Sequence, residues 1–185
     1  FHNDPRTMKG AKTINDRLKL LNNVDKIIFI SNWVKKKFFE GLPYLSENKT
    51  QVIYHSIDPV KKSTKKYKQI IFVGKLNESK GYDLFCKSLF LILNKHKDWN
   101  AISIGDEKRF QHYLTHEKHL NLGQIPHKKV LQFLNKSEIA VIPSRWEEPF
   151  GRTALEATSR GCATIISNRG GLTETTDHAI VLKDL

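Results

Sequence analysis

Two glutamates in the stretch "PSRWEEPFGRTALEA" (143–157) are the first candidates for chemistry. Glu148 and Glu156 have seven residues between them, with Pro149 and Gly151 inside that interval. Proline and glycine disfavour helix before about residue 151, so Glu148 belongs to a loop and Glu156 to the helix that follows. The first N–H groups of a helix have no partner within it. The pattern therefore places two acids around a set of free backbone donors, which is an arrangement that can hold a polar ligand.

Glu156 also has a purely structural interpretation. Thr153 and Glu156 have the spacing of a capping box, in which the glutamate reaches back to the amide of the helix-capping residue. Glu148, next to a second glutamate and a proline, could simply be exposed. Local sequence leaves both interpretations open.

A second candidate is the glycine-lysine loop "VGKLNESKG" (73–81). Gly74 ends an apolar run, Lys75 and Lys80 follow, and a helix is expected to start near Ser79. Because a helix start favours anions, the two lysines indicate a phosphate or diphosphate site. The alternative is a polar loop with solvated lysines, since the full phosphate-binding motif G-x-x-x-x-G-K-[ST] is not present.

Two further patterns carry less information. The tandem glycines of "NRGGLTE" (168–174) give a backbone room to approach a ligand, or form a plain turn. His112, His116 and His119 have helical spacing, but His119 should begin a strand and no Cys or acid completes a zinc set. We therefore predict no metal site.

Short runs rich in Val, Ile and Phe alternate with helical patterns along most of the chain. The expected strands are 25–30, 50–56, 69–74, 99–105, 119–123, 138–144, 162–167 and 179–182. The expected helices are 31–42 (with Ser31 and Gly41 as its caps), 80–96, 107–118, 126–137 and 151–161, with a turn or short helix at 171–176.

Helix-sized connections between strands require parallel pairing. The fold class is therefore α/β, with a Rossmann-like doubly wound parallel sheet over residues 69–185. Residues 58–68 are basic and lack periodicity, so they are interpreted as a linker after an N-terminal part, 1–57. In such sheets ligands bind at the carboxyl ends of the strands. That rule gathers the segments 74–80, 105–106, 123–126 and 144–153 at one edge.

Charge and cysteine content limit the surroundings of the protein. Its 185 residues carry a net charge of +12, and residues 1–68 hold 15 Lys and Arg against 6 Asp and Glu. Such an excess suits nucleic acid, anionic lipid or a phosphorylated substrate, or is only a solvated face. Cys86 and Cys162 lie among apolar or small neighbours, which indicates reduced core thiols and a cytoplasmic protein. No run of about 18 apolar residues predicts a membrane span.

The ordered segments "VGKLNESKG", "SIGD", "NLGQIP", "PSRWEEPFGRTALEA" and "SRGCATIISNRGGLTE" resemble the donor-binding domain of retaining glycosyltransferase family 4, also called glycosyl transferases group 1. The resemblance covers residues 69–185 and implies the C-terminal half of a GT-B fold. Residues 25–58 resemble the end of the family's N-terminal, acceptor-binding domain. "FHND" at the start is similar to a strand end where family members place an active-site histidine.

The resemblance implies a role for each matching position. Glu148 and His2 would act at the sugar as catalytic residues. Lys75 and Lys80 would hold the diphosphate, and Glu156 the ribose. The backbone amides of Phe150, Gly151 and Arg152 would hold the sugar or the diphosphate, and Ile125 would offer backbone contacts to the base. Gly105 and Thr153 would also bind the donor. No metal cofactor is implied, because cationic side chains cover the diphosphate. The donor would be a UDP-sugar or GDP-sugar.

Two departures from the family pattern stand out. Lys75 replaces a more usual Arg, which keeps the charge but loses the bidentate fork. Pro149 replaces a more usual Gly and stiffens the loop. The abrupt start without Met, and the lack of most of an N-terminal domain and of the usual C-terminal helix, predict a fragment that binds donor without transferring sugar by itself.

The implied function is sugar transfer, with retention, to a glycan or lipid-linked acceptor, in bacterial cell-surface polysaccharide or lipopolysaccharide synthesis. A sugar-nucleotide 2-epimerase of the same fold and a basic nucleic-acid-binding module are the alternatives. The second would need aromatic residues among the basic ones, and only Tyr67 lies among the linker lysines. Basic residues that could meet anionic lipid at the inner face of the plasma membrane are Lys35, Lys36, Lys37, Lys61, Lys62, Lys65 and Lys66.

Overall fold

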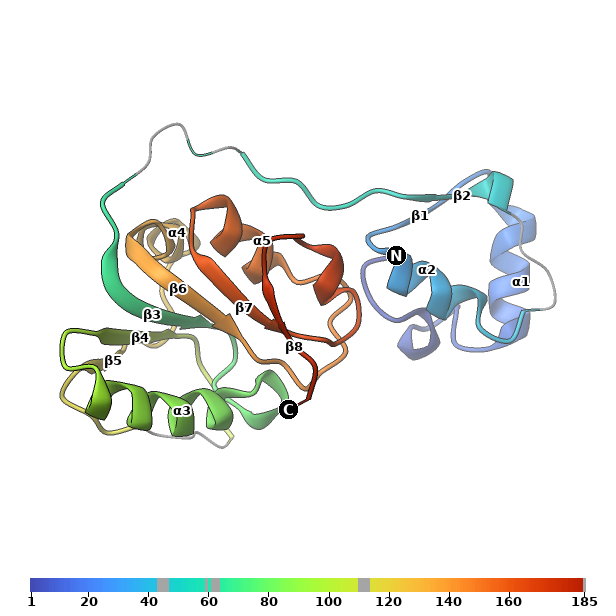
Figure 1. The fold of residues 1–185 in the computed structure, drawn as a ribbon. Helices are drawn as coiled ribbons and strands as arrows, with labels where there is room; N and C mark the ends of the chain where they lie inside the picture. The colour runs from blue at the N-terminus through green and yellow to red at the C-terminus, as the bar shows by residue number, and fades with distance from the viewer. Residues whose placement is uncertain (43–46, 59, 61–63, 110–113, 185) are drawn as a thin grey trace.

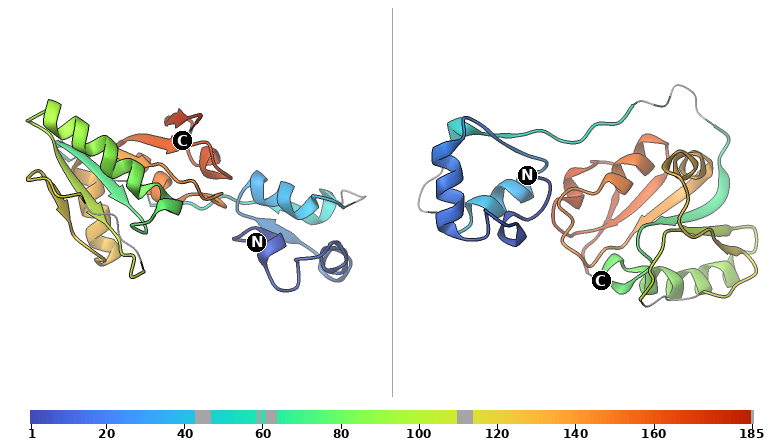
Figure 2. Two further views of the ribbon diagram at one scale, coloured as in Figure 1. Left: turned by 90° about the horizontal axis from the view of Figure 1, so that it is seen from below. Right: turned by 180° about the vertical axis from the view of Figure 1, so that it is seen from behind.

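The structure is a computed structural model that describes residues 1–185 except 43–46, 59, 61–63, 110–113 and 185 (Figure 1). It contains a six-stranded sheet and a separate two-stranded sheet. Between the part that carries the small sheet and the part that carries the large one, the described residues 53–58 after β2 and 64–66 before β3 are in neither helix nor strand. Figure 2 gives two further views of the two parts. None of the described helices is long and apolar enough to cross a membrane.

The large sheet has the strand order β5-β4-β3-β6-β7-β8, and every described pairing within it is parallel. Its strands are β3 (Tyr67–Val73), β4 (Asn100–Ile104), β5 (His119–Asn121), β6 (Ser137–Ile142), β7 (Ala163–Ser167) and β8 (Ile180–Leu182). The order reverses between β3 and β6, which are neighbours although β6 is fourth of the six in sequence. Doubly wound sheets bind ligands at such a reversal, outside the carboxyl ends of the strands.

Helices cover both faces of this sheet, as predicted. One face is covered by α3 (Tyr82–Lys95), and the other by α4 (His127–Lys136) and α5 (Arg152–Ser159). Strand β3 shows the reason: Ile70 and Phe72 pack in the α3 core, while Ile71 packs in the α4 and α5 core. Since successive side chains of a strand point to opposite faces, a fully apolar run is what a strand buried on both sides requires.

The N-terminal part has a core of its own. It contains α1 (Ile14–Asn23), β1 (Ile27–Phe29), α2 (Asn32–Phe39) and β2 (Thr50–Val52), with single 3-10 turns η1 (Pro5–Thr7) and η2 (Glu47–Lys49). Phe29, Val34 and Phe38 are fully buried in this core. Phe150, from the loop before α5, is buried in the same cluster. The N-terminal core is therefore completed by a residue of the larger part.

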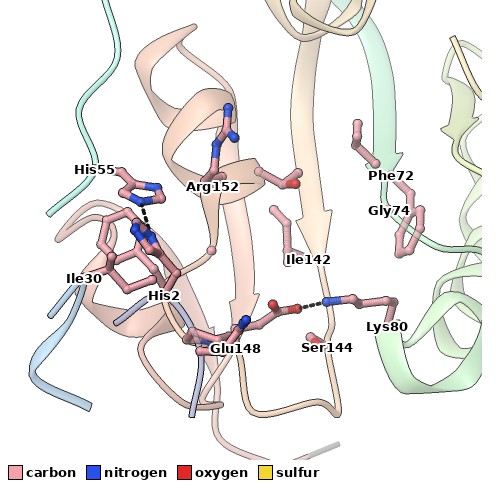
Figure 3. Close-up of a pocket in the computed structure, with 16 residues that line it drawn as sticks. His2, Ile30, His55, Phe72, Gly74, Lys80, Ile142, Ser144, Glu148 and Arg152 are labelled. Carbon is pink, nitrogen blue, oxygen red and sulfur yellow. Dashed lines mark hydrogen bonds and ion pairs between the residues drawn. The ribbon is translucent and has the colours of Figure 1, made fainter. Parts of the chain in front are cut away.

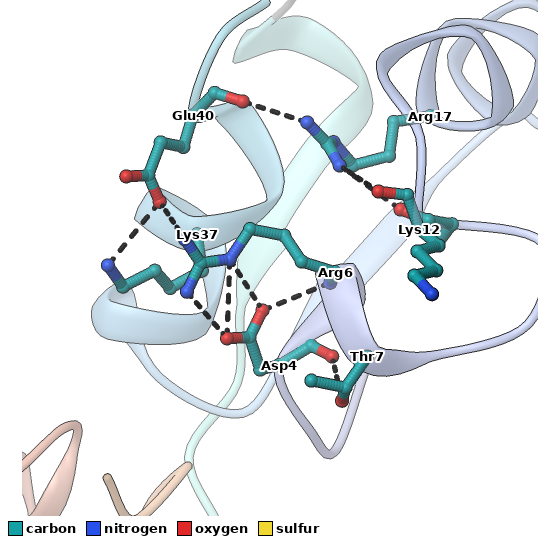
Figure 4. A network of polar contacts seen from close by, with 8 residues as sticks. Asp4, Arg6, Thr7, Lys12, Arg17, Lys37 and Glu40 are labelled. Carbon is teal, nitrogen blue, oxygen red and sulfur yellow. Dashed lines mark hydrogen bonds and ion pairs between the residues drawn. The ribbon is translucent and has the colours of Figure 1, made fainter.

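A polar network anchors the first residues of the chain to α2 (Figure 4). Asp4 caps the turn η1 and accepts hydrogen bonds from Arg6, which also pairs with Glu40 at 2.7 Å. The guanidinium of Arg6 lowers the pKa of Asp4. Arg17 is buried and donates to the carbonyl of Glu40 and to those of Ala11 and Lys12. This network fixes the segment that carries His2.

Several element predictions were wrong. The helix expected over 107–118 is not formed: the described residues 105–109 and 114–118 are non-helical. The Glu107 carboxylate bonds the amide of Arg109, a local contact that competes with helix formation. Strand 50–56 ends at Val52, and β3 begins at Tyr67, inside the expected linker 58–68. The turn η3 (Glu78–Lys80) precedes α3, which begins at Tyr82 rather than near Ser79.

Helix α1 was not predicted, although Thr13 and Asp16 form a full capping box at its start. The expected helix over 31–42 is confirmed in type. Ser31 caps its start as predicted. The C-cap is Glu40, and Gly41, at φ +79°, follows it. A bridge between Cys86 and Cys162 is excluded, because the two free thiols lie in the cores on opposite faces of the sheet.

Candidate functional site

A pocket of about 310 Å³ lies at the strand reversal, where β3 and β6 end (Figure 3). The sheet contributes Gly74, which follows β3, and Ile142 and Ser144, from the end of β6. The loop between β6 and α5, residues 143–151, forms another wall and is called the site loop below. The predicted site residues that line this pocket are His2, Lys80, Glu148, Phe150, Gly151, Arg152 and Thr153.

Lys80 and Glu148 face each other across the pocket. Their Nζ and Oε1 atoms are 2.6 Å apart, and the side chains are 29% and 14% exposed. Lys80 comes from η3 and Glu148 from the site loop, so two elements far apart in sequence supply one ion pair. An ammonium and a carboxylate held this way are a charged pair that a polar ligand can separate.

The position of Lys80 depends on two further polar residues. Asn77 caps η3, and its Oδ1 accepts from the amide of Lys80 at 3.1 Å. Its Nδ2 donates to Oε2 of Glu107 at 2.8 Å. Hydrogen bonds from Asn77 and from the Arg109 amide lower the pKa of Glu107 to about 2. The ionised Glu107 thus orients Asn77, which orients the lysine.

Helix α5 begins at the same pocket. Gly151 is its cap, at φ +111°, and no side chain caps this end. The first intrahelical acceptor is the carbonyl of Gly151, which takes the amides of Ala154 and Leu155. The amides of Arg152 and Thr153 precede these and have no partner within the helix. The predicted set of helix N–H donors therefore lies beside Lys80 and Glu148.

His2 meets a second histidine at the pocket mouth (Figure 3). Its Nδ1 lies 3.4 Å from Nε2 of His55, and the His55 ring makes an edge contact with Phe150 at 5.5 Å between centroids. Burial lowers the pKa of His55, and His2 and Arg152 lower it further. His55 was missed from the sequence. It follows β2, so the rule that sites lie after parallel strands would have found it.

Lys75 and Gly105 line a second cavity of about 580 Å³ that shares Gly74 with the first. Gly105 lies here for a steric reason, because a Cβ on it would be 1.7 Å from the carbonyl oxygen of Gly74. Ile125 is partly buried against the α4 and α5 core. The two predicted diphosphate lysines are therefore in adjoining cavities rather than side by side.

Glu156 lines a third cavity with His127 and with Arg152, which also borders the central pocket. The capping-box interpretation of Glu156 is wrong. The helix cap is Gly151, Thr153 lies inside the helix, and the Glu156 carboxylate binds His127 at 2.9 Å and Arg152 at 3.4 Å. The Glu156 side chain is only 8% exposed, so its carboxylate is largely shielded from solvent while it makes these two contacts. His127 gave no sequence signal as a site residue.

The tandem glycines approach the protein's own backbone and not an open cavity. A Cβ on Gly170 would lie 2.2 Å from the carbonyl oxygen of Glu148, and one on Gly171 would lie 2.4 Å from that of Pro149. The amide of Gly171 donates to the carbonyl of Glu148 at 2.6 Å. The ligand hypothesis for this motif is corrected: its glycines support the site loop.

The structure also places some of the lysines predicted to meet lipid and one of the histidines considered for a metal site. Lys66 does not belong to a lipid-facing surface, because its ammonium donates to the carbonyls of Leu134, Ser137 and Arg160. Lys61 and Lys62 lie outside the described residues, as does His112. His119 begins β5 as predicted and bonds Ser103 at 2.8 Å. Across the part of the chain that the structure describes, no cluster of three His, Cys, Asp or Glu residues could hold a metal.

Residues 55–182 match the sequence profile of the family described as Glycosyl transferases group 1. A Klebsiella pneumoniae protein, "Uncharacterized 42.6 kDa protein in cps region", is 34% identical over 157 residues, which cover 82% of this chain and 40% of that protein. The Saccharomyces cerevisiae phosphatidylinositol N-acetylglucosaminyltransferase GPI3 subunit is 28% identical over 174 residues, covering 83% of this chain and 38% of that protein. The chain thus spans about two fifths of the length of these relatives.

Solved structures share the fold. Anabaena Alr3699/HepE in complex with UDP superposes with a TM-score of 0.75 at 18% identity, covering 98% of this chain and 56% of that one. The same protein in complex with UDP-glucose gives a TM-score of 0.72. The predicted α/β class and the Rossmann-like sheet of a GT-B fold are confirmed by this likeness and by the strand order.

Proposed function

The chain belongs to the glycosyl transferases group 1 family, and on that premise we propose that the protein it belongs to transfers a sugar from a UDP-sugar or GDP-sugar to a glycan or lipid-linked acceptor. One observation carries the proposal. The Lys80–Glu148 pair and the open start of α5 meet in one pocket at the strand reversal of the large sheet. These groups suit the two charges that develop when a nucleoside diphosphate leaves a sugar.

The leaving group is the first of these charges. When the bond between the anomeric carbon and the phosphate oxygen breaks, its electron pair stays on the diphosphate. Lys80 and the amides of Arg152 and Thr153 line the pocket and stabilise that negative charge. Lys75 reaches the same diphosphate from the adjoining cavity, across Gly74. Since cationic side chains supply the positive charge that offsets the diphosphate, the transfer needs no divalent metal, and activity should persist in EDTA.

The sugar carries the second charge. It becomes oxocarbenium-like as the bond lengthens, and the Glu148 carboxylate stands next to the pocket that would hold it. His2 and His55 line the same pocket, on the side away from Lys80 (Figure 3). The acceptor hydroxyl attacks from the face that the diphosphate leaves and passes its proton to the departing phosphate oxygen, so the step balances and the configuration is retained. Glu156 binds the ribose of the nucleoside from the third cavity, and Ile125 offers backbone contacts to the base.

The proposal also includes the cellular setting of the reaction. The relative in a cps region favours synthesis of cell-surface polysaccharide or lipopolysaccharide. We place the enzyme in the cytoplasm, in peripheral contact with anionic membrane through exposed basic residues such as Lys36 and Lys65. Co-sedimentation with liposomes should then rise with their anionic lipid content. Equal sedimentation at all lipid compositions would contradict the membrane contact.

Calorimetric titration of the chain with UDP-glucose, GDP-glucose and ADP-glucose tests the donor site. We expect binding of one or more of them, which the Glu148→Gln variant retains and which needs no metal. Binding of none of the three would refute the donor site. Release of nucleoside diphosphate only when an acceptor is added to the full-length protein would separate sugar transfer from isomerisation of the donor.

A further inference from the structure

The carboxylate of Glu174 joins the larger part of the molecule to the N-terminal part. Glu174 is the last residue of the turn η4 (Leu172–Glu174). Its Oε2 accepts from the amide of Asn32 and its Oε1 from the amide of Trp33, both at 2.7 Å. These are the first two residues of α2, whose amides have no partner within that helix. A negative charge at a helix start is also favoured by the helix dipole.

The same end of α2 is hydrogen-bonded to the site loop. Ser31, the cap of α2, donates its hydroxyl to the carbonyl of Pro149 at 2.6 Å and accepts from the amide of Val34. On the other side, the amide of Gly171 donates to the carbonyl of Glu148 at 2.6 Å. The carbonyls of Glu148 and Pro149 are therefore each held by a hydrogen bond, one from Gly171 and the other from Ser31. Gly171 lies three residues before Glu174, so one short segment makes both connections.

Tyr54 ties these contacts to the pocket. Its hydroxyl donates to Oε2 of Glu174 at 3.1 Å, and its ring stacks on Phe150 at 5.7 Å between centroids. Phe150 is 3% exposed and lies in the N-terminal core. Its backbone belongs to the site loop, which borders the pocket, while its side chain points into the other part of the protein.

We propose that Glu174 is a positioning residue: by holding the start of α2, it fixes the site loop and with it the Glu148 carboxylate opposite Lys80. A carboxylate is required because two divergent amides each need an acceptor oxygen. Glutamine offers only one such oxygen, and its amide group would face the second N–H. This inference rests on the proposed function for its catalytic meaning, but the contacts it invokes can be tested without any ligand.

Hydrogen exchange of single amides tests the joint directly. In the wild-type chain we expect the amides of Asn32, Trp33 and Gly171 to be protected. Glu174→Ala should speed exchange at Asn32 and Trp33 by about tenfold or more, as loss of a charge-assisted hydrogen bond implies, and should also speed exchange at Gly171. In Glu174→Gln the exchange rates of these amides should lie between those of the wild type and those of Glu174→Ala. Glu117→Ala, which removes one charge from an exposed turn, is the matched control.

One further variant and one reference amide show whether faster exchange is specific to the Glu174 contacts. Tyr54→Phe removes one bond to Glu174 but keeps the stack on Phe150, so it should change exchange at Asn32 and Trp33 by less than about threefold. The amide of Ile71, in the core of β3, should keep its wild-type rate in every variant, which excludes global unfolding. Unchanged exchange at Asn32 and Trp33 in Glu174→Ala would overturn the joint. Faster exchange there with an unchanged Gly171 would overturn its connection to the site loop.

Donor kinetics then test the positioning role. In the full-length protein, Glu174→Ala should lower kcat by about tenfold with a smaller change in KM. The reason is that the displaced Glu148 carboxylate acts at the sugar more than on the diphosphate. Glu174→Gln should recover part of that loss. Wild-type kcat in Glu174→Ala would reduce the joint to a structural contact. If the wild-type protein binds no nucleotide sugar, the proposed function fails, while the exchange results still decide whether Glu174 holds the site loop.

Discussion

Replacing Lys80 with methionine separates the two charges that meet in the central pocket. Lys80 lies 2.6 Å from Glu148, and the pair is mostly buried. Lys80→Met keeps most of the apolar stem and removes the ammonium. We expect weaker binding of the nucleotide diphosphate, because the ammonium would otherwise replace its bond to Glu148 with one to the leaving phosphate.

The size of the effect follows from competing contacts. A hydrogen bond to a charged group contributes about 1.5–3 kcal/mol, which corresponds to roughly a 10- to 150-fold change in Kd. Part of this is offset, since Lys80 gives up its contact with Glu148 when it turns to the ligand. The lower part of the range, about 10- to 30-fold, is therefore expected for UDP. In Glu148→Gln the offset shrinks, so UDP should bind as tightly as in wild type or up to about fivefold tighter.

Calorimetry with UDP at fixed ionic strength measures both variants. Lys87→Met, an exposed change on α3, is the matched control and should bind like wild type. The reasoning fails if Lys80→Met keeps wild-type affinity while the control behaves as expected. It also fails if Glu148→Gln weakens UDP binding as much as Lys80→Met does, because the two groups would then act together on the ligand rather than compete for the ammonium.

Three other perturbations address the remaining parts of the site. Glu156→Gln should weaken UDP binding by about tenfold and leave inorganic diphosphate binding unchanged in the same titrations, because its proposed partner is the ribose. Burial holds the pKa of His55 below its ordinary value of 6.5, so the unfolded chain takes up the proton first and the free energy of unfolding falls as the pH drops below about 6.5. Urea titrations should show a flatter pH dependence for His55→Gln, and no such change for the exposed His178→Gln. Gly170→Ala should lower the unfolding temperature well beyond Gly123→Ala: both glycines have φ near +60°, but a Cβ meets a backbone oxygen at 2.2 Å only at Gly170. Equal losses in the two would show that backbone strain alone matters.

The sequence predicted the large sheet well because its signals are local. Each apolar run is bounded by glycine or polar residues, and each helix has its own apolar stripe. Once parallel pairing is inferred, the carboxyl-edge rule brings Lys80, Glu148 and Arg152 together without any knowledge of side-chain positions. The structure places all three at one pocket. The catalytic and binding roles themselves, the division into 1–57, 58–68 and 69–185, and the retention of configuration remain predictions.

Two of the failures involve partners distant in sequence, whereas the missed helix α1 begins with a capping box that is local. Thr153 and Glu156 fit a local capping pattern, but Glu156 is held by His127 from the neighbouring helix. The segment 107–118 looked helical by composition, yet Glu107 is committed to Asn77, thirty residues earlier. Isolated helical propensity is weak without an apolar face to bury. In both places a side-chain contact with a residue about thirty positions away differs from what the local pattern predicted.

The site loop has two faces that do different work, and this explains its composition. Its backbone and Glu148 border the pocket, whereas Phe150 is buried in the N-terminal core and the Pro149 carbonyl accepts from Ser31. Proline fixes φ at position 149 and so reduces the backbone freedom of the loop. The hydrogen bond from Ser31 then holds the Pro149 carbonyl itself. The central pocket and the contact between the two parts of the chain therefore share the site loop, and a change in one should alter the other.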